Sequence, residues 1–123
     1  MADVLLVDDS KTMRMLIMRA LRQAGYRSLT IEEAENGQDA LQKIGAANPK
    51  LVLSDWNMPE MSGIEFLRKL RGSHITVPFG FITSEASKEI KNEAMNAGAH
   101  FLITKPFTSE AVQDALSPIF GEA

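Results

Sequence analysis

The sequence predicts an α/β fold, a doubly wound parallel sheet of five strands with helices on both faces, in a (βα)5 three-layer sandwich. Two observations support this fold class. Five short apolar segments alternate with five longer segments in which apolar residues recur at intervals of three and four. The chain has 123 residues, 45% hydrophobic and 24% charged, which is the size and composition of one globular domain. Because crossovers between parallel strands are right-handed, few other topologies remain.

The first half of the chain is predicted to contain three strands and two helices. The strands are Val4–Val7, Leu29–Ala34 and Leu51–Leu53. The first helix ends at Gly25, and its apolar stripe consists of Met13, Leu16, Ile17, Ala20, Leu21 and Ala24. The second helix follows the turn at Asn36–Gly37, ends before Pro49, and carries Ala40, Leu41, Ile44 and Ala47.

The second half repeats this alternation. A turn-rich loop, NMPEMSG, leads from Asp55 to a helix with apolar residues at Ile64, Leu67 and Leu70. The remaining strands are Phe79–Thr83 and Phe101–Ile103. The fourth helix carries Ile90, Ala94 and Ala97 and ends at Gly98; the last carries Ala111, Val112, Ala115, Leu116 and Ile119.

Polar side chains follow all five predicted strands; Glu35 and Asn36, after the second strand, are left aside, because the other four strand ends converge on one rim of the sheet. The residues at these four ends are Asp8 and Asp9 after the first strand, Asp55 after the third, Thr83 at the end of the fourth and Lys105 after the fifth. In doubly wound sheets, ligands bind outside the carboxyl ends of the strands, near the point where the strand order reverses. We therefore expect these side chains to lie together at one rim of the sheet.

Their chemistry indicates a divalent cation and a phosphoryl group. Three aspartates without a neighbouring His or Cys suit Mg²⁺ rather than zinc or copper. Because Mg²⁺ is usually held by one or two carboxylates, a further carboxylate is free to attack phosphorus and form an aspartyl phosphate. Lys105 would neutralise the phosphoryl oxygens, and Thr83 would hydrogen-bond one of them.

Each of these residues has a simpler interpretation when taken alone. Asp9 or Ser10 could be only the N-cap of the next helix, and Asp55 only a solvated turn residue. The Lys105–Pro106 dipeptide could be an ordinary loop. Their joint occurrence at matching strand ends favours the functional interpretation.

Composition excludes several other classes of site. The chain has no cysteine, which excludes disulfides, zinc–thiolate sites and thiol catalysis. Its net charge of −3, without a basic patch, argues against nucleic acid as a partner. No segment has the pattern of a signal peptide or the length of a membrane span, so we expect a cytoplasmic protein without membrane insertion.

Four segments, VLLVDDS, SDWNMPEMSGIEFL, FITSEA and LITKPF, resemble the receiver domain of bacterial two-component response regulators, and more narrowly the single-domain chemotaxis regulators. The similarity extends from Asp3 to about Phe120. It implies a flavodoxin-like fold with the strand order 2-1-3-4-5 known for this family. It also implies a single receiver domain over residues 1–123, with no output domain.

The resemblance assigns a role to each residue at the rim. Asp55 would be the phosphoacceptor, with Thr83 as the switch hydroxyl and Lys105 as the lysine of the site. The ligands of Mg²⁺, or of Mn²⁺ in its place, would be Asp8, Asp9, Asp55 and the backbone carbonyl of Asn57. Lys105 and Pro106 would be joined by a cis peptide bond.

The resemblance further implies a function and its partners. A sensor histidine kinase would donate the phosphoryl group, and the domain would catalyse its own phosphorylation and dephosphorylation without turning over an external substrate. The protein would be a monomer that signals in chemotaxis by phosphorylation-dependent binding to a downstream target, the flagellar motor switch or another protein. A phosphorelay intermediate or phosphate sink, and a binding module independent of phosphorylation, remain alternatives.

Two other classes are disfavoured by single positions. A phosphatase of the haloacid dehalogenase class needs a second Asp two residues after the nucleophile, where this chain has Asn57. A flavin-binding protein of similar architecture would use the loop after the first strand to bind phosphate, and the segment DDSKTM would repel it.

One position departs from the family. Many receivers carry an aromatic residue three positions before the lysine, which turns inward on activation; here the residue is Leu102. The neighbouring Phe101 is not expected to replace it, because successive residues of a strand point to opposite faces. The resemblance also places Trp56 on the surface over the site.

Overall fold

The sheet contains five parallel strands in the order β2-β1-β3-β4-β5 over residues 2–122, the part of the chain that this computed structural model describes. The strands are β1 (Val4–Val7), β2 (Ile31–Ala34), β3 (Leu51–Asp55), β4 (Phe79–Thr83) and β5 (Phe101–Thr104). The order reverses at β1, which pairs with β2 on one side and with β3 on the other. The predicted doubly wound fold is confirmed.

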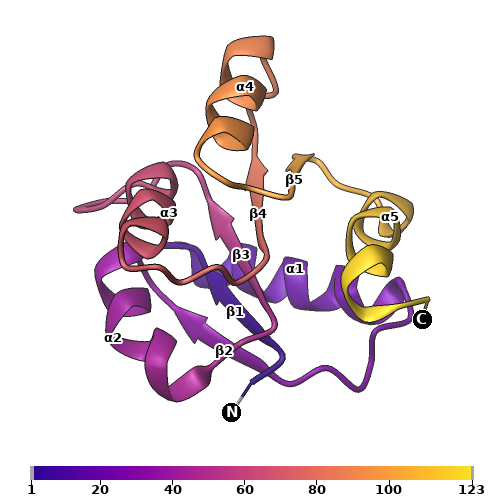
Figure 1. The fold of residues 1–123 in the computed structure, drawn as a ribbon. Coiled ribbons are helices and arrows are strands. Elements are labelled where there is room, and N and C mark those ends of the chain that lie inside the picture. The colour runs from indigo at the N-terminus through magenta and orange to yellow at the C-terminus, as the bar shows by residue number, and fades with distance from the viewer. Residues whose placement is uncertain (1, 123) are drawn as a thin grey trace.

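Helices cover both faces of the sheet. They are α1 (Lys11–Gln23), α2 (Gly37–Ala47), α3 (Gly63–Gly72), α4 (Lys88–Asn96) and α5 (Ser109–Phe120). Figure 1 shows α1 and α5 on one face and α2 and α3 on the other. Helix α4 belongs to the second face, because its buried Ala94 packs in the same apolar cluster as α2 and α3. The molecule is therefore the predicted three-layer sandwich.

Two hydrophobic cores lie against the two faces of the sheet, and β1 contributes to both. Its residues Leu5 and Val7 pack under α2 and α3, whereas Val4 and Leu6 pack under α1 and α5. All four side chains have no exposed surface. Central parallel strands covered on both faces have this continuous apolar sequence. Because β1 is so deeply buried, Asp8, the residue that follows it, also lies in the interior with 1% of its surface exposed.

Two strand boundaries differ from the predicted ones by two residues each, and β5 also extends by one residue, to Thr104. Strand β2 begins at Ile31 rather than Leu29, because the side chain and backbone of Thr30 bond to Asp3 instead of entering the sheet. Strand β3 extends beyond Leu53 to Asp55, which pairs with Ile82 of β4. The second difference places the predicted phosphoacceptor on the sheet itself.

Each helix begins at a polar N-cap residue. The caps are Ser10, Asn36, Ser62, Ser87 and Thr108, and each side-chain oxygen accepts the N–H three residues further on. For α1 the cap is Ser10, whose hydroxyl accepts the N–H of Met13 at 3.1 Å. Helix capping therefore accounts for Ser10 and leaves the carboxylates of Asp8 and Asp9 to be explained in another way.

Candidate functional site

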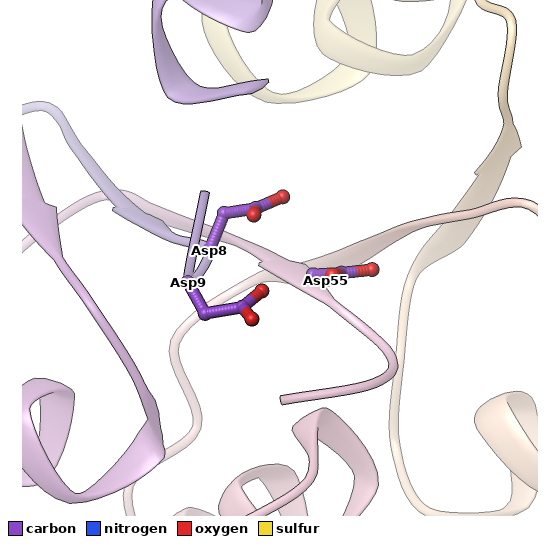
Figure 2. A group of neighbouring side chains, drawn as sticks. All are labelled: Asp8, Asp9 and Asp55. Carbon is purple, nitrogen blue, oxygen red and sulfur yellow. The ribbon is translucent and has the colours of Figure 1, made fainter. Parts of the chain in front are cut away.

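Three carboxylates converge where β1 and β3 end. Asp8 and Asp9 follow β1, Asp55 is the last residue of β3, and each offers an oxygen within 4.8 Å of those of the other two. Figure 2 shows the three side chains together at this rim of the sheet. Asp8 is buried, Asp55 is partly buried and Asp9 is exposed, so the cluster opens to solvent on one side. The structure thus brings together the three aspartates that the sequence predicts as metal ligands.

Asp8 is the most deeply buried of the three. Its Oδ1 accepts the N–H of Ser10 at 2.9 Å, which fixes the side chain in a short turn. Its Oδ2 is fully buried and has no hydrogen-bond partner within residues 2–122. A buried carboxylate oxygen without a partner is costly in free energy. Since the cluster supplies hard oxygen donors around it, this oxygen fits a divalent cation such as Mg²⁺.

Asp55 is held by two donors. The backbone N–H of Trp56 donates to its Oδ1 at 2.8 Å, and the ammonium of Lys105 donates to the same oxygen at 3.3 Å. Lys105 also lies 3.8 Å from Oδ2 of Asp8, so one ammonium group faces the buried Asp8 and the partly buried Asp55. The side chains of Lys105 and Asp55 are 19% and 13% exposed, which leaves Asp55 accessible from solvent.

Burial sets the electrostatics of the site. It raises the pKa of the Asp8 carboxyl, and the charges of Asp55 and Asp9 raise it further, whereas the hydrogen bond from the N–H of Ser10 and the charge of Lys105 offset only part of the increase. Burial likewise raises the pKa of Asp55 despite the opposing charge and hydrogen bond of Lys105. Three carboxylates and one ammonium leave the rim with excess negative charge. A bound cation would remove the cost of keeping Asp8 and Asp55 ionised.

Thr83 lies beside the cluster at the end of β4. It is one position beyond Ile82, the pairing partner of Asp55, and only 1% of its surface is exposed. Its hydroxyl oxygen accepts the N–H of Glu85 at 3.2 Å, so its own hydrogen remains available for donation. The backbone carbonyl of Thr83 accepts the N–H of Lys105 at 2.7 Å, which ties the ends of β4 and β5 together. The Lys105–Pro106 bond is cis, as the resemblance implies.

The loop after β3 folds closely against the site. Its Gly63 donates its N–H to the carbonyl of Trp56 at 2.9 Å, which closes the loop at the start of α3. A Cβ on Gly63 would lie 2.2 Å from the carbonyl oxygen of Asp55. Asn57 is exposed in this loop, and its role as a carbonyl ligand of the metal stays a prediction.

The expectation for Trp56 is wrong. Its side chain is only 9% exposed and packs against Phe81 with a centroid distance of 4.7 Å. The indole lies in the apolar cluster between the sheet and α3, and the backbone carbonyl of Trp56 accepts the N–H of Gly63. Trp56 is therefore next to the site through its backbone N–H and within the core through its side chain.

Arg14 is a residue of this region that the sequence prediction missed. It lies in the first turn of α1, is 8% exposed, and bonds to the carbonyl of Asp8. Its spacing from Ile17 and Leu21 places a charge within the buried stripe of the helix, which is the only signal in the sequence for such a role.

Comparison with known proteins establishes the family. The chain matches the response regulator receiver domain over residues 4–117. The chain belongs to this family. It is 38% identical to the chemotaxis protein CheY1 of Helicobacter pylori strain J99 over 121 residues, covering 96% of each chain. It is 35% identical to the chemotaxis protein CheY of Pseudomonas aeruginosa, covering 95% of this chain and 94% of that protein.

Solved receiver structures share the fold. The chemotaxis protein CheY4 of Vibrio cholerae superposes with a TM-score of 0.83 at 36% identity, over 98% of this chain and 99% of that one. The receiver domain of the Francisella response regulator 1452 gives a TM-score of 0.84 at 26% identity, over 97% and 96%. This receiver is thus of the CheY type and is a two-component signalling protein. Within residues 2–122, no helix combines the length and apolarity that crossing a membrane requires.

The receiver departs from the aromatic pattern at β5 as predicted. Leu102 is half-buried and packs with the core under α2, α3 and α4. Phe101 packs with the other core, and its ring lies over Gly80, where a Cβ would be 2.1 Å from the ring. The two side chains are on opposite faces of the sheet, so Phe101 does not replace the missing aromatic residue.

Proposed function

We propose that Asp55 accepts a phosphoryl group from a sensor histidine kinase in a Mg²⁺-dependent reaction, and that the phosphorylated receiver signals by binding another protein. The observation that carries this proposal is the buried Oδ2 of Asp8, which accepts no hydrogen bond within residues 2–122 and lies in a cluster with Asp55 and Lys105. Residues 1–123 would act as a single receiver domain and a monomer. The catalysis would be limited to its own phosphorylation and dephosphorylation.

The donor set supports Mg²⁺, with Mn²⁺ as an alternative, held by Asp8, Asp9, Asp55 and the carbonyl of Asn57. Bound there, the cation would neutralise charge on the equatorial phosphoryl oxygens. A carboxylate oxygen of Asp55 would bond to phosphorus while the bond from phosphorus to the donor imidazole breaks, and the released imidazole would take a proton from solvent. Attack of water on the phosphorus would later break the new bond and release inorganic phosphate.

Lys105 and Thr83 would contact the oxygens of the phosphoryl group. Lys105, now 3.3 Å from Asp55, would move its contact to a phosphoryl oxygen. Thr83 would donate its free hydroxyl hydrogen to another, because its oxygen already accepts the N–H of Glu85. Both residues lie where β4 and β5 end. Their movement toward the phosphoryl group would change the relative populations of the conformations of the neighbouring surface.

The test is the intact mass of the protein after incubation with acetyl phosphate. We expect one added phosphoryl group in the presence of Mg²⁺, and none with a chelator or in Asp55→Asn. The matched control is Asp114→Asn, an exposed aspartate of α5 outside the cluster, which should be labelled like the wild type. Labelling of Asp55→Asn, or labelling of the wild type in chelator, would contradict the proposal.

Leu102 keeps one alternative open. Without an aromatic residue on this face of β5, the receiver could pass or store the phosphoryl group with little change of its surface, as a phosphorelay intermediate or phosphate sink. Amide hydrogen exchange with and without a beryllium fluoride adduct separates the two. Altered exchange in α4 and β5 supports phosphorylation-dependent binding of a downstream target, such as the flagellar motor switch. Unaltered exchange supports the alternative.

A further inference from the structure

Arg14 is a buried cation that links three elements near the candidate metal site. Its Nη1 donates to the carbonyl of Asp8 at 2.5 Å, and its Nε donates to Oε1 of Glu33 at 2.9 Å. Glu33 is on β2, directly opposite Leu6 of β1. The guanidinium therefore connects α1, the turn after β1, and β2.

The contact with Asp8 completes the hydrogen bonding at the end of β1. The N–H of Asp8 still pairs with the sheet, donating to Ala34 of β2 at 3.1 Å, but its carbonyl lies beyond the last pairing residue of the strand. A carbonyl at this buried position needs a donor. Arg14 supplies it from one turn into α1, because long helical side chains point back toward the N-terminus of their helix.

This bond fixes the peptide that joins the two adjacent carboxylates. The carbonyl of Asp8 belongs to the peptide unit whose N–H is that of Asp9, so the guanidinium sets the plane of the link between them. The carboxylate of Asp8 is held separately, by the N–H of Ser10 on its Oδ1. Together these contacts leave Oδ2 of Asp8 facing the cluster with Asp9 and Asp55.

We propose that Arg14, supported by Glu33, is a positioning residue for the metal site, holding the Asp8–Asp9 peptide so that both carboxylates reach one cation. The inference rests on the proposed function, since it concerns the affinity of the same site for Mg²⁺. A planar guanidinium is suited to this role because its fork bonds the carbonyl and the carboxylate at once. A lysine offers a single ammonium and would hold the peptide less firmly.

The experiment compares Mg²⁺ binding by calorimetry in Arg14→Gln, Arg14→Lys and Glu33→Gln, with Arg22→Gln as the control. Arg22 is exposed in the last turn of the same helix. We expect Arg14→Gln to raise the dissociation constant for Mg²⁺ on the order of tenfold, the usual effect of losing an outer-shell partner. Arg14→Lys should lie between Arg14→Gln and the wild type, Glu33→Gln should have a smaller effect, and Arg22→Gln should have none.

A second readout does not use the metal. In the metal-free protein, the amides of Asp9 and Ser10 should exchange faster in Arg14→Lys than in Arg22→Gln. If the Arg14 variants unfold more easily but bind Mg²⁺ as tightly as the wild type, Arg14 is only structural and the inference is wrong. Should Arg14→Gln fail to fold, Arg14→Lys and Glu33→Gln decide the same question. If the wild type itself binds no Mg²⁺ at millimolar concentration, the proposed function fails, and the inference fails with it.

Discussion

The two ends of β1 carry the same residue type in opposite situations. Asp3, before the strand, accepts the N–H and the hydroxyl of Thr30 at 2.9 and 3.1 Å and lies 3.7 Å from Lys50. The backbone bond from Thr30 is the main reason why the pKa of Asp3 lies below its usual value. Asp8, after the strand, has one buried oxygen that accepts no hydrogen bond within residues 2–122 and has only Lys105 nearby, at 3.8 Å, and burial raises the pKa of Asp8.

This contrast separates a carboxylate that stabilises the fold from one that we propose binds a cation. Hydrogen bonds to an ionised carboxylate favour folding, as at Asp3. A buried carboxylate with an unpaired oxygen opposes folding until a cation binds, and binding then stabilises the folded state. The amino end of the sheet is therefore expected to contribute stability, and the carboxyl end function.

The largest effect is expected from comparing the Mg²⁺ affinities of Asp8→Asn and Asp3→Asn. Asp8→Asn should weaken Mg²⁺ binding by about 100-fold or more, because losing even an outer-shell partner costs about 10- to 100-fold. Asp3→Asn should leave Mg²⁺ binding unchanged, because Asp3 lies at the other end of the strand. Calorimetric titration measures both. Similar affinities in the two variants would show that the ends of β1 do not differ in this way.

The second test is on the two ends of α3, which begins at Gly63 and ends at Gly72. Gly63→Ala should destabilise the protein by about 1–3 kcal/mol, because the added methyl group would overlap the carbonyl of Asp55. Gly72→Ala should stabilise it by about 0.5–1 kcal/mol, since a Cβ there meets nothing within 4 Å and alanine favours the helix. Urea unfolding provides both values. Equal effects would mean that the loop around Asp55 is not tightly packed.

The rim could be predicted from sequence because topology decides it. Once the strands are parallel and doubly wound, the residues that end them must meet, so the cluster of Asp8, Asp9 and Asp55 follows from the apolar pattern of β1 and β3. Their unequal burial does not follow from the same pattern. Asp8 is buried like the strand residues before it, whereas the adjacent Asp9 is exposed. The chain turns at this point, and the turn is held by the hydrogen bond from the N–H of Ser10 to Oδ1 of Asp8.

The side chains whose positions the sequence does not predict are those held by contacts with distant segments of the chain. The resemblance predicts Trp56 at the surface, whereas its side chain packs against Phe81, which lies 25 residues further along the chain. The sequence pattern does not predict the role of Arg14, because charged helical residues are usually solvated and its partners, Asp8 and Glu33, are 6 and 19 residues away. Both depend on how distant segments meet, which helix and strand periodicity does not describe.

The third test uses pH in the metal-free protein. The folded pKa values of Asp8 and Asp55 lie above 3.8, so the stability they contribute is complete below pH 3.8 and is lost as the pH rises through the folded values. The folded pKa of Asp3 lies below 3.8, so its contribution is present above pH 3.8 and is lost as the pH falls through that lower value.

Urea unfolding between pH 3 and 7 should therefore give opposite trends in the two variants. Relative to the wild type, Asp8→Asn should become more stable as the pH rises, and the deficit of Asp3→Asn should shrink as the pH falls. Saturating Mg²⁺ should reverse the first trend, because only the wild type gains from the cation. Parallel curves for the two variants would remove the distinction between the ends of the strand.

The smallest expected effect is optical, and it reports on the carboxyl end alone. The backbone N–H of Trp56 donates to Oδ1 of Asp55, so a cation bound by this carboxylate changes the charge next to Trp56 and should change the intensity of its indole emission. Its wavelength should change little, because the ring stays packed against Phe81 and shielded from water. Asp3→Asn should keep the response at millimolar Mg²⁺, and Asp8→Asn should lose it over the same range. If the wild type shows no change in emission, the indole does not report on the metal site. If Asp8→Asn keeps the change, the signal comes from a cation bound elsewhere.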